Sequence, residues 1–190
     1  VLMVQREVAE RIAAPPGKMS YLSVFVQYHA RVRIAFPVPA HAFEPDPAVE
    51  SAVIVVEPYD ADDRLDPETE DQLWRLVQAA FRERRKMIHN VLSRQLPIDG
   101  TRVTAALEAA HIDPDRRPQT LAVGEWLALR EAIGPIGEDR RRAVEPLAVG
   151  AEGRLQDAGP GERAVLALEH RVEAEHELLL VGEVVDHVVA

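Results

Sequence analysis

The hydrophobic pattern differs between residues 1–58 and residues 67–133 of this chain, and that difference limits the folds the chain can adopt. Residues 1–58 contain three short apolar runs typical of strands, at positions 1–4, 31–36 and 51–56. Residues 67–133 instead place apolar side chains at the i, i+3, i+4 spacing of amphipathic helices. The sequence therefore predicts an α/β region followed by a small all-helical domain.

Charge and helix-stopping residues set the breaks between the expected helices. One apolar stripe runs from Leu73 to Phe81, and continuing it unbroken would bury Arg84. A bend or helix junction is therefore expected near residues 82–84, followed by a second stripe of Met87, Ile88, Val91 and Leu92. Further helices are expected at residues 6–13, 22–28, 102–110 and 123–133, and Gly134-Pro135 stops the last of them.

Composition and turn signals divide the chain into four segments. Residues 1–59 form the α/β region, residues 60–66 an acidic linker and residues 67–135 the helical domain. The segment 136–190 contains no aromatic residue, and because aromatic side chains supply much of the area of small cores, we expect this unassigned tail to pack poorly. Its Glu and His residues at 169–177 include metal-binding types, but acids alternating with apolar residues indicate a solvated face, so no metal site is predicted.

The composition also excludes several classes of protein. There is no cysteine among the 190 residues, which excludes disulfides and thiolate metal sites and is compatible with a cytoplasmic location. No apolar run approaches the ~18 residues that a membrane span needs, so no membrane partner is expected. The segment Val1–Val4 has no basic region and no cleavage site, so we expect a strand there and not a signal peptide.

A dense basic cluster interrupts a chain whose formal net charge is -10. The cluster consists of Arg82, Arg84, Arg85 and Lys86, with Glu83 among them. A basic stripe in an acidic protein is costly in self-repulsion, which favours a role in binding phosphate groups. The alternative is a helix face that is only solvated. His89 lies one turn further on, where it either joins this face or is a solvent-exposed histidine.

A second candidate site is the loop that contains Phe43. Pro45 and Pro47 follow it at alternate positions, which forbids a helix and favours an extended loop leading into the strand at 51–56. A rigid loop that presents one aromatic ring offers a surface on which a base can stack, worth ~1–3 kcal/mol per base. The alternative is that Phe43 fills the core and that the prolines only shape a turn.

Five segments in one order resemble the KsgA/RsmA family of rRNA adenine dimethyltransferases. Val4–Arg11 is similar to the family's V-Q-K-E-V-A-x-R, and the residues from Tyr21 to Tyr28 resemble its Y-G-x-L-S-V-x-x-Q-Y. The remaining three are Phe43–Val53 (F-x-P-x-P-x-V-x-S-A-V), Ala80–Asn90 (A-F-x-Q-R-R-K-x-x-x-N) and Ile112–Leu121 (G-I-D-P-x-x-R-x-x-x-L). The resemblance covers residues 1 to about 133 and does not extend to the tail.

The resemblance implies a fold and an activity. It implies the C-terminal part of a Rossmann-like S-adenosylmethionine methyltransferase sheet, followed by the helical rRNA-binding domain. The family transfers methyl groups to two adjacent adenines in the 3′-end hairpin loop of small-subunit rRNA. Its glycine-rich cofactor loop and its N-L-P-Y motif have no counterpart in this sequence, which also has no Gly-x-Gly after a strand. We therefore expect no cofactor-binding and no catalytic residue in this chain, and no activity from it alone.

The resemblance also assigns roles to particular residues. Phe43 matches the aromatic residue that packs against the extruded adenine. Arg82, Arg84, Arg85 and Lys86 would contact rRNA phosphates, and Arg116 and Arg117 would extend that patch. The alternative for one arginine near the junction is that it pairs with Glu83 or caps a helix C-terminus. Ala122 stands where the family has a serine helix cap, so Gln119 or Thr120 is expected to replace it.

Two other functions remain open on the sequence. One is a standalone RNA- or ribosome-binding module without catalysis. The other is an antibiotic-resistance methyltransferase of large-subunit rRNA, although the Arg-Arg-Lys and Ile-Asp-Pro segments favour the small-subunit enzyme. In every case the expected partner is rRNA, for the first function within an immature 30S particle, and a monomer is expected.

Overall fold

The computed structural model describes residues 1–60 and 65–137 of the chain. Val1–Gly137 form one compact unit, and the second unit, Glu138–Ala190, lies outside the described residues, as do the expectations for the tail and its Glu and His residues. The sequence-based divisions at residues 59 and 67 fall inside the first unit, so the α/β region and the helices are described together.

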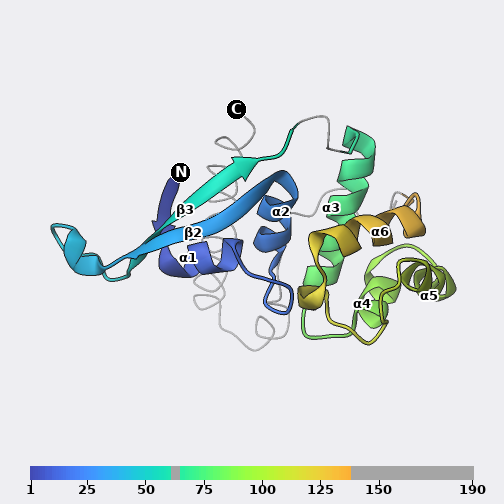
Figure 1. Cartoon of the computed structure of the whole chain (residues 1–190). Coiled ribbons are helices and arrows are strands. Elements are labelled where there is room, and N and C mark those ends of the chain that lie inside the picture. The colour runs from blue at the N-terminus through green and yellow to red at the C-terminus, as the bar shows by residue number, and fades with distance from the viewer. Residues whose placement is uncertain (61–64, 138–190) are drawn as a thin grey trace, which may run out of the picture. The chain divides into compact units, whose positions relative to one another are not determined.

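The three strands predicted from the apolar runs are present and form one antiparallel sheet (Figure 1). They are β1 (Leu2–Gln5), β2 (Ala30–Val38) and β3 (Ser51–Pro58), in the spatial order β1-β3-β2. The central strand pairs Ile54 with both Leu2 and Ile34. A bulge between Ile34 and Phe36 shifts the register of β2, so that Phe36 lies opposite Val53. Such bulges are common in the edge strands of sheets.

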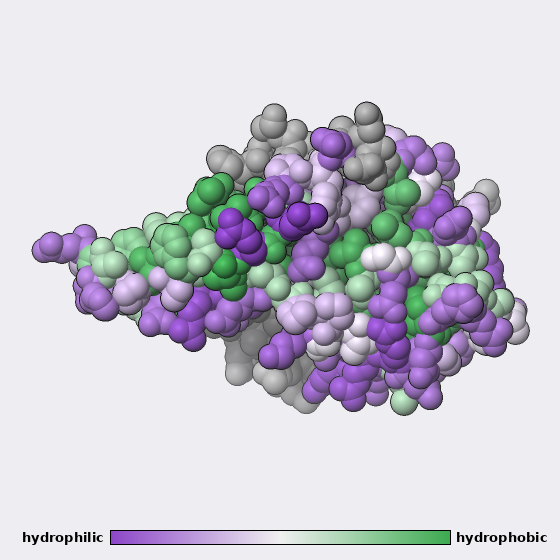
Figure 2. Space-filling view, viewed as in Figure 1, coloured by the Kyte–Doolittle hydropathy of each residue, from purple (hydrophilic) through white to green (hydrophobic). Residues whose placement is uncertain are grey.

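Two helices cover one face of the sheet. The helices α1 (Arg6–Ile12) and α2 (Tyr21–His29) contact the strands and bury Ala52 and Ile54 of β3. Because side chains alternate along a strand, Met3 and Phe36 point to the other face, where both are 55% exposed. Figure 2 shows hydrophobic residues gathered over the strands. One face of the sheet is therefore packed, and the other carries exposed apolar side chains.

Four helices follow the sheet, close to the predicted positions. They are α3 (Pro67–Phe81), α4 (Ile88–Gln95), α5 (Gly100–Ala109) and α6 (Val123–Ile133), with the short 3-10 turn η3 (Pro118–Thr120) before α6. Another 3-10 turn, η1 (Ala40–Ala42), lies between β2 and β3. Aspartates begin two of the four helices, because Asp66 accepts a bond from the Thr69 amide and Asp99 one from the Thr101 amide. The predicted junction near residues 82–84 is confirmed, since α3 ends at Phe81. Met87, however, is 44% exposed and does not belong to the buried stripe of α4.

The core of the helical part also includes residues from the α/β region. Leu73, Leu76 and Trp126 are almost completely buried between α3 and α6. Met19, in the α1–α2 loop, and Tyr28, on α2, belong to the same cluster. The Tyr28 hydroxyl also accepts a hydrogen bond of 3.2 Å from the Leu65 amide. Helix α2 therefore packs on the sheet with one side and on the helices with the other.

Candidate nucleic-acid interface

The turn between α3 and α4 is held in place by its single acid. Glu83 accepts a hydrogen bond from Arg94 Nη2 at 2.9 Å and one from Gln95 Nε2 at 3.1 Å. Arg82 also reaches Gln95, whose Oε1 lies 3.4 Å from Arg82 Nη1. The pairing with Glu83 expected for one arginine is thus made by Arg94, which lies on α4 and not in the cluster. These contacts fix the turn against α4 and leave the rest of the cluster outside.

The three remaining cations, Arg84, Arg85 and Lys86, form what we call the basic turn. All three are exposed, and their side chains make no hydrogen bond or ion pair with residues 1–60 or 65–137. Arg75, on the preceding helix, differs because its Nε lies 2.8 Å from Asp71 Oδ2. Unpaired cations are the groups available for charge-assisted bonds to an external anion.

The loop that begins at Asp113 is bonded to the first turn of α4. Asp113 Oδ1 accepts a bond of 2.9 Å from the Asp115 amide, which tightens the start of the loop. The Ile88 amide donates to the Arg116 carbonyl at 2.7 Å, and the His89 amide to the Pro114 carbonyl at 3.4 Å. These bonds satisfy helix amides that have no partner within the helix. They also place the loop directly beside the basic turn.

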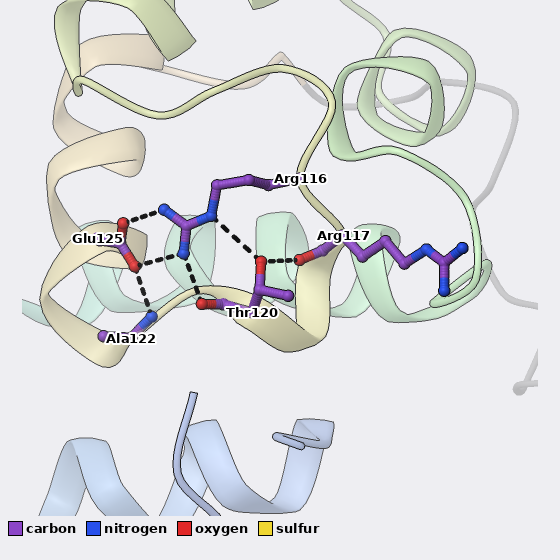
Figure 3. A network of polar contacts seen from close by, with 5 residues as sticks. All are labelled: Arg116, Arg117, Thr120, Ala122 and Glu125. Carbon is purple, nitrogen blue, oxygen red and sulfur yellow. Dashed lines mark hydrogen bonds and ion pairs between the residues drawn. The ribbon is translucent and has the colours of Figure 1, made fainter. Parts of the chain in front are cut away.

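Arg116 and Arg117 are adjacent in sequence but point in opposite directions (Figure 3). Arg116 forms an ion pair with Glu125, and its Nη2 also donates to the Thr120 carbonyl at 2.5 Å. Arg117 is exposed, and its side chain has no partner among the described residues. The geometry therefore gives Arg116 a role inside the protein that the sequence did not predict. RNA contact by Arg116 stays a prediction, whereas Arg117 is placed to extend the basic turn.

Glu125, the partner of Arg116, also takes part in the N-terminal cap of α6, which differs from the cap that the sequence predicted. Ala122 has no side-chain acceptor, and neither Gln119 nor Thr120 replaces it; instead Glu125 Oε2 accepts a bond of 2.8 Å from the Ala122 amide. The hydrogen bond from Arg116 holds the pKa of Glu125 below its usual value, and the same bond raises the pKa of Arg116. A glutamate three residues after a helix start is a known capping signal, so Glu125 was detectable in the sequence.

Phe43 lies apart from the basic turn. It follows η1 in the β2–β3 connection, which extends away from α3–α6 in Figure 1. The ring is half-buried and does not belong to the hydrophobic core, so the alternative in which it fills the core does not hold. Pro45 and Pro47 lie in non-helical loop, as predicted. The structure thus leaves Phe43 partly accessible, and base stacking on it stays a prediction.

His89 is fixed by its neighbours. Its Nε2 lies 3.0 Å from Thr104 Oγ1 on α5, and its Nδ1 lies 3.4 Å from Asn90 Oδ1. It is half-buried and links α4 to α5.

No cluster of three or more His, Asp or Glu side chains suited to a metal ion occurs in the described residues. Within those same residues no helix combines the length and the apolar character needed to cross a membrane.

The described glycines do not form a site for a methyl donor. Such a site needs glycines directly after a strand, where the backbone must approach the cofactor closely. The described glycines are Gly17, Gly100, Gly124, Gly134 and Gly137, and each lies in a helix or in a loop that does not directly follow a strand. The described residues therefore contain no glycine turn directly after a strand of the kind that such a cofactor needs.

Comparison with known proteins identifies the family. A family model described as ribosomal RNA adenine dimethylase matches residues 1–133. The chain belongs to this family. The resemblance carried by the five motifs is thereby confirmed, and the match ends where α6 ends.

Curated relatives agree with the family model. "Ribosomal RNA small subunit methyltransferase A" of Sphingopyxis alaskensis is 46% identical over 135 residues, which are 70% of this chain and 47% of that protein. The protein of the same name from Synechococcus sp. (strain RCC307) is 42% identical over 137 residues, covering 71% and 49%. The chain thus spans about half the length of the curated relatives it matches.

Solved structures support the predicted fold class. The 23S rRNA methyltransferase ErmE has a TM-score of 0.55 at 24% identity, covering 69% of this chain and 52% of that one. A dimethyladenosine transferase from Plasmodium falciparum has a TM-score of 0.56 at 22% identity, covering 67% and 54%. At these identities the likeness concerns the fold alone. The α/β methyltransferase fold expected from the sequence is confirmed.

Proposed function

We propose that this chain is the rRNA-docking part of an S-adenosylmethionine-dependent methyltransferase of small-subunit rRNA. Its target would be two adjacent adenines in the 3′-end hairpin loop, reached in the cytoplasm on an immature 30S particle. The basic turn of Arg84, Arg85 and Lys86 carries the proposal, because these cations are exposed and unpaired within the described residues. Family membership supplies rRNA as the polyanion that such a surface would meet.

The proposed contacts would fix position and would not read sequence. Arginine and lysine bonded to phosphate oxygens orient a protein on its RNA, while bases are recognised elsewhere. Arg117 would add a fourth cation beside the basic turn, and Arg82, already bonded to Gln95, would contribute less. Arg116 would act indirectly, since its guanidinium is committed to Glu125 and to Thr120. Phe43 would stack on the extruded adenine, at the other end of the unit.

Salt dependence of RNA binding tests this proposal. Binding of the 3′-end hairpin RNA would be measured by fluorescence anisotropy between about 50 and 200 mM salt, for the native chain and for a variant with Arg84, Arg85 and Lys86 changed to Ala. Each lost phosphate contact lowers the slope of log K against log salt concentration by about 0.7–0.9. The triple variant should therefore lose about 2–3 units of slope. Arg75→Ala is the matched control, because Arg75 pairs with Asp71.

The outcome separates the basic turn from a merely solvated turn. If the triple variant keeps the native slope, the basic turn does not contact RNA and the proposal fails. If Arg75→Ala flattens the slope as much as the triple variant does, the effect reflects general charge and not a docking surface, which also contradicts the proposal.

Catalysis by this chain alone is a separate question. We infer that it does not bind S-adenosylmethionine, because the described glycines do not form the necessary turn. Titration calorimetry with S-adenosylmethionine tests this inference, and micromolar binding would overturn it. RNA binding without cofactor binding would fit both the partial enzyme and the standalone RNA-binding module, which remains the alternative.

A further inference from the structure

Beyond the basic turn, the loop between α1 and α2 is bonded to the helical part. The Gly17 amide donates to the Gln119 carbonyl at 2.8 Å, and the Met19 amide donates to the same carbonyl at 3.3 Å. In return, Gln119 Nε2 donates to the Gly17 carbonyl at 3.2 Å. Gly17 has φ +103°, a conformation that residues with a side chain rarely adopt. Both backbone polar groups of Gly17 are thus bonded to Gln119.

These bonds set the position of Lys18, the residue between the two donors. Met19 is only 3% exposed and belongs to the core of the helical part, so the loop is anchored on both sides of the bonded segment. Lys18 itself is exposed, and its side chain has no hydrogen bond or ion pair in the described part of the chain. Gln119 is two residues from Arg117, and two residues of extended chain span about 7 Å. Lys18 therefore lies near Arg117.

The charges around Lys18 differ from those around Arg6 and Arg11, two other cations of the α/β region. Arg6 pairs with Glu10 and Glu50, and Arg11 pairs with Glu7. By contrast, the segments 13–20 and 117–122 contain no acidic residue. Asp113 and Asp115 precede η3 and Glu125 follows it; Asp113 accepts a bond from the Asp115 amide, and Glu125 is already paired with Arg116. In a chain with a formal net charge of -10, an unpaired lysine whose own segment carries no acid is a place where a phosphate can bind.

We propose that Lys18 is a nucleic-acid phosphate contact and that the Gly17–Gln119 bonds position it beside Arg117. One basic surface then runs from the basic turn through Arg117 to the α1–α2 loop. It joins the helical part to the α/β region, so that a single RNA strand contacts both. This inference rests on the proposed function, because it names a further contact of the same RNA.

Lysine footprinting tests the inference directly, since Lys18 and Lys86 are the two lysines of the chain. The full chain would be acetylated with a limiting amount of an amine-reactive ester, with and without the hairpin RNA, and the two lysines read by mass spectrometry. We expect RNA to protect both. Protection of Lys86 without Lys18 would overturn this inference and leave the proposed function standing. Protection of neither would overturn both.

Variants sharpen the same test. Lys18→Ala should lower the salt slope of RNA binding by about 0.7–0.9, and Lys18→Arg should retain the native slope because the charge is kept. Gln119→Ala removes only the side-chain bond to the Gly17 carbonyl and keeps the two backbone bonds, so it should reduce the effect of Lys18→Ala only in part. Arg6→Ala is the matched control, since Arg6 is paired on the same part of the chain. A native slope for Lys18→Ala contradicts the proposal.

Discussion

The helices α3–α6 and the sheet place their apolar side chains in different environments. In the helices the large apolar residues converge on one core, where Trp126 and Leu129 are 0% exposed. In the sheet, Ile54 is equally buried, but Met3 and Phe36 on the opposite face are each 55% exposed. A helix buries one stripe against several neighbours, whereas a sheet has two faces that each need a cover. Substitutions in the two parts should therefore have very different costs.

The difference also shows where rigidity is available for binding. Backbone bonds to the first turn of α4 hold the loop after Asp113, and the basic turn is held through Glu83, which is bonded to Arg94 and Gln95 on the same helix. Phe43 lies instead on the long β2–β3 connection. A site built on packed helices keeps its geometry better than a site on a loop. This favours the helical part as the docking surface.

Trp126→Ala should have the largest effect. Removing a completely buried indole, whose centroid lies 5.9 Å from that of Phe81, leaves a cavity that the four helices cannot fill. We expect the free energy of unfolding to fall by about 3–5 kcal/mol. Urea denaturation followed by far-UV circular dichroism measures it. Trp126→Phe is the control and should lose much less, because Trp126 Nε1 has no hydrogen-bond partner to lose.

Arg116→Ala should be next, since it leaves Glu125 without its partner near the start of α6. Charge-assisted bonds of this kind contribute about 2 kcal/mol. The pKa of Glu125 is lowered in the folded state, so the stabilisation is present above the usual glutamate pKa and is lost as the pH falls through the lower value. In denaturation experiments at different pH, Glu125→Gln should lose less stability as the pH falls than the native chain does. An equally steep loss in Glu125→Gln would show that other carboxylates cause it.

Ser20→Ala tests the helix that joins the two parts. Ser20 Oγ accepts a bond of 3.2 Å from the Ser23 amide, and Ser23 Oγ accepts one of 2.8 Å from the Ser20 amide. Loss of this helix cap should cost about 1 kcal/mol in thermal or urea denaturation. Because α2 packs on the sheet and on the helical core, both parts should unfold in one transition. Two separate transitions in this variant would show that the parts are energetically independent.

Phe36→Ser should have the smallest effect on stability. The ring is 55% exposed, so we expect a change within about 0.5 kcal/mol. Ile54→Ala on the buried face is the matched control and should cost about 2–5 kcal/mol. A loss above about 1 kcal/mol for Phe36→Ser would show that the outer face of the sheet is covered in solution. Both variants are compared by urea denaturation.

Local patterns predicted the elements and the break between them. The short apolar runs became β1, β2 and β3, and the stripe from Leu73 ended where a buried Arg84 would have been required. Such features depend on neighbouring residues, so they can be read directly. The prediction that Met87 belongs to the buried stripe was wrong, because Met87 is exposed. A single apolar residue at a helix start does not reveal which way its side chain points.

The family, the fold class and the basic cluster at residues 82–86 follow from the order of the residues along the chain. Which cations are unpaired depends on the folded structure. It paired Arg94 with Glu83 and Arg116 with Glu125, and it brought Gly17 to Gln119 across 102 positions of sequence. Charge and periodicity depend on nearby residues, whereas ion pairs between distant segments exist only once the chain has closed those loops. Which arginine binds RNA and which holds the protein together is therefore a property of the fold.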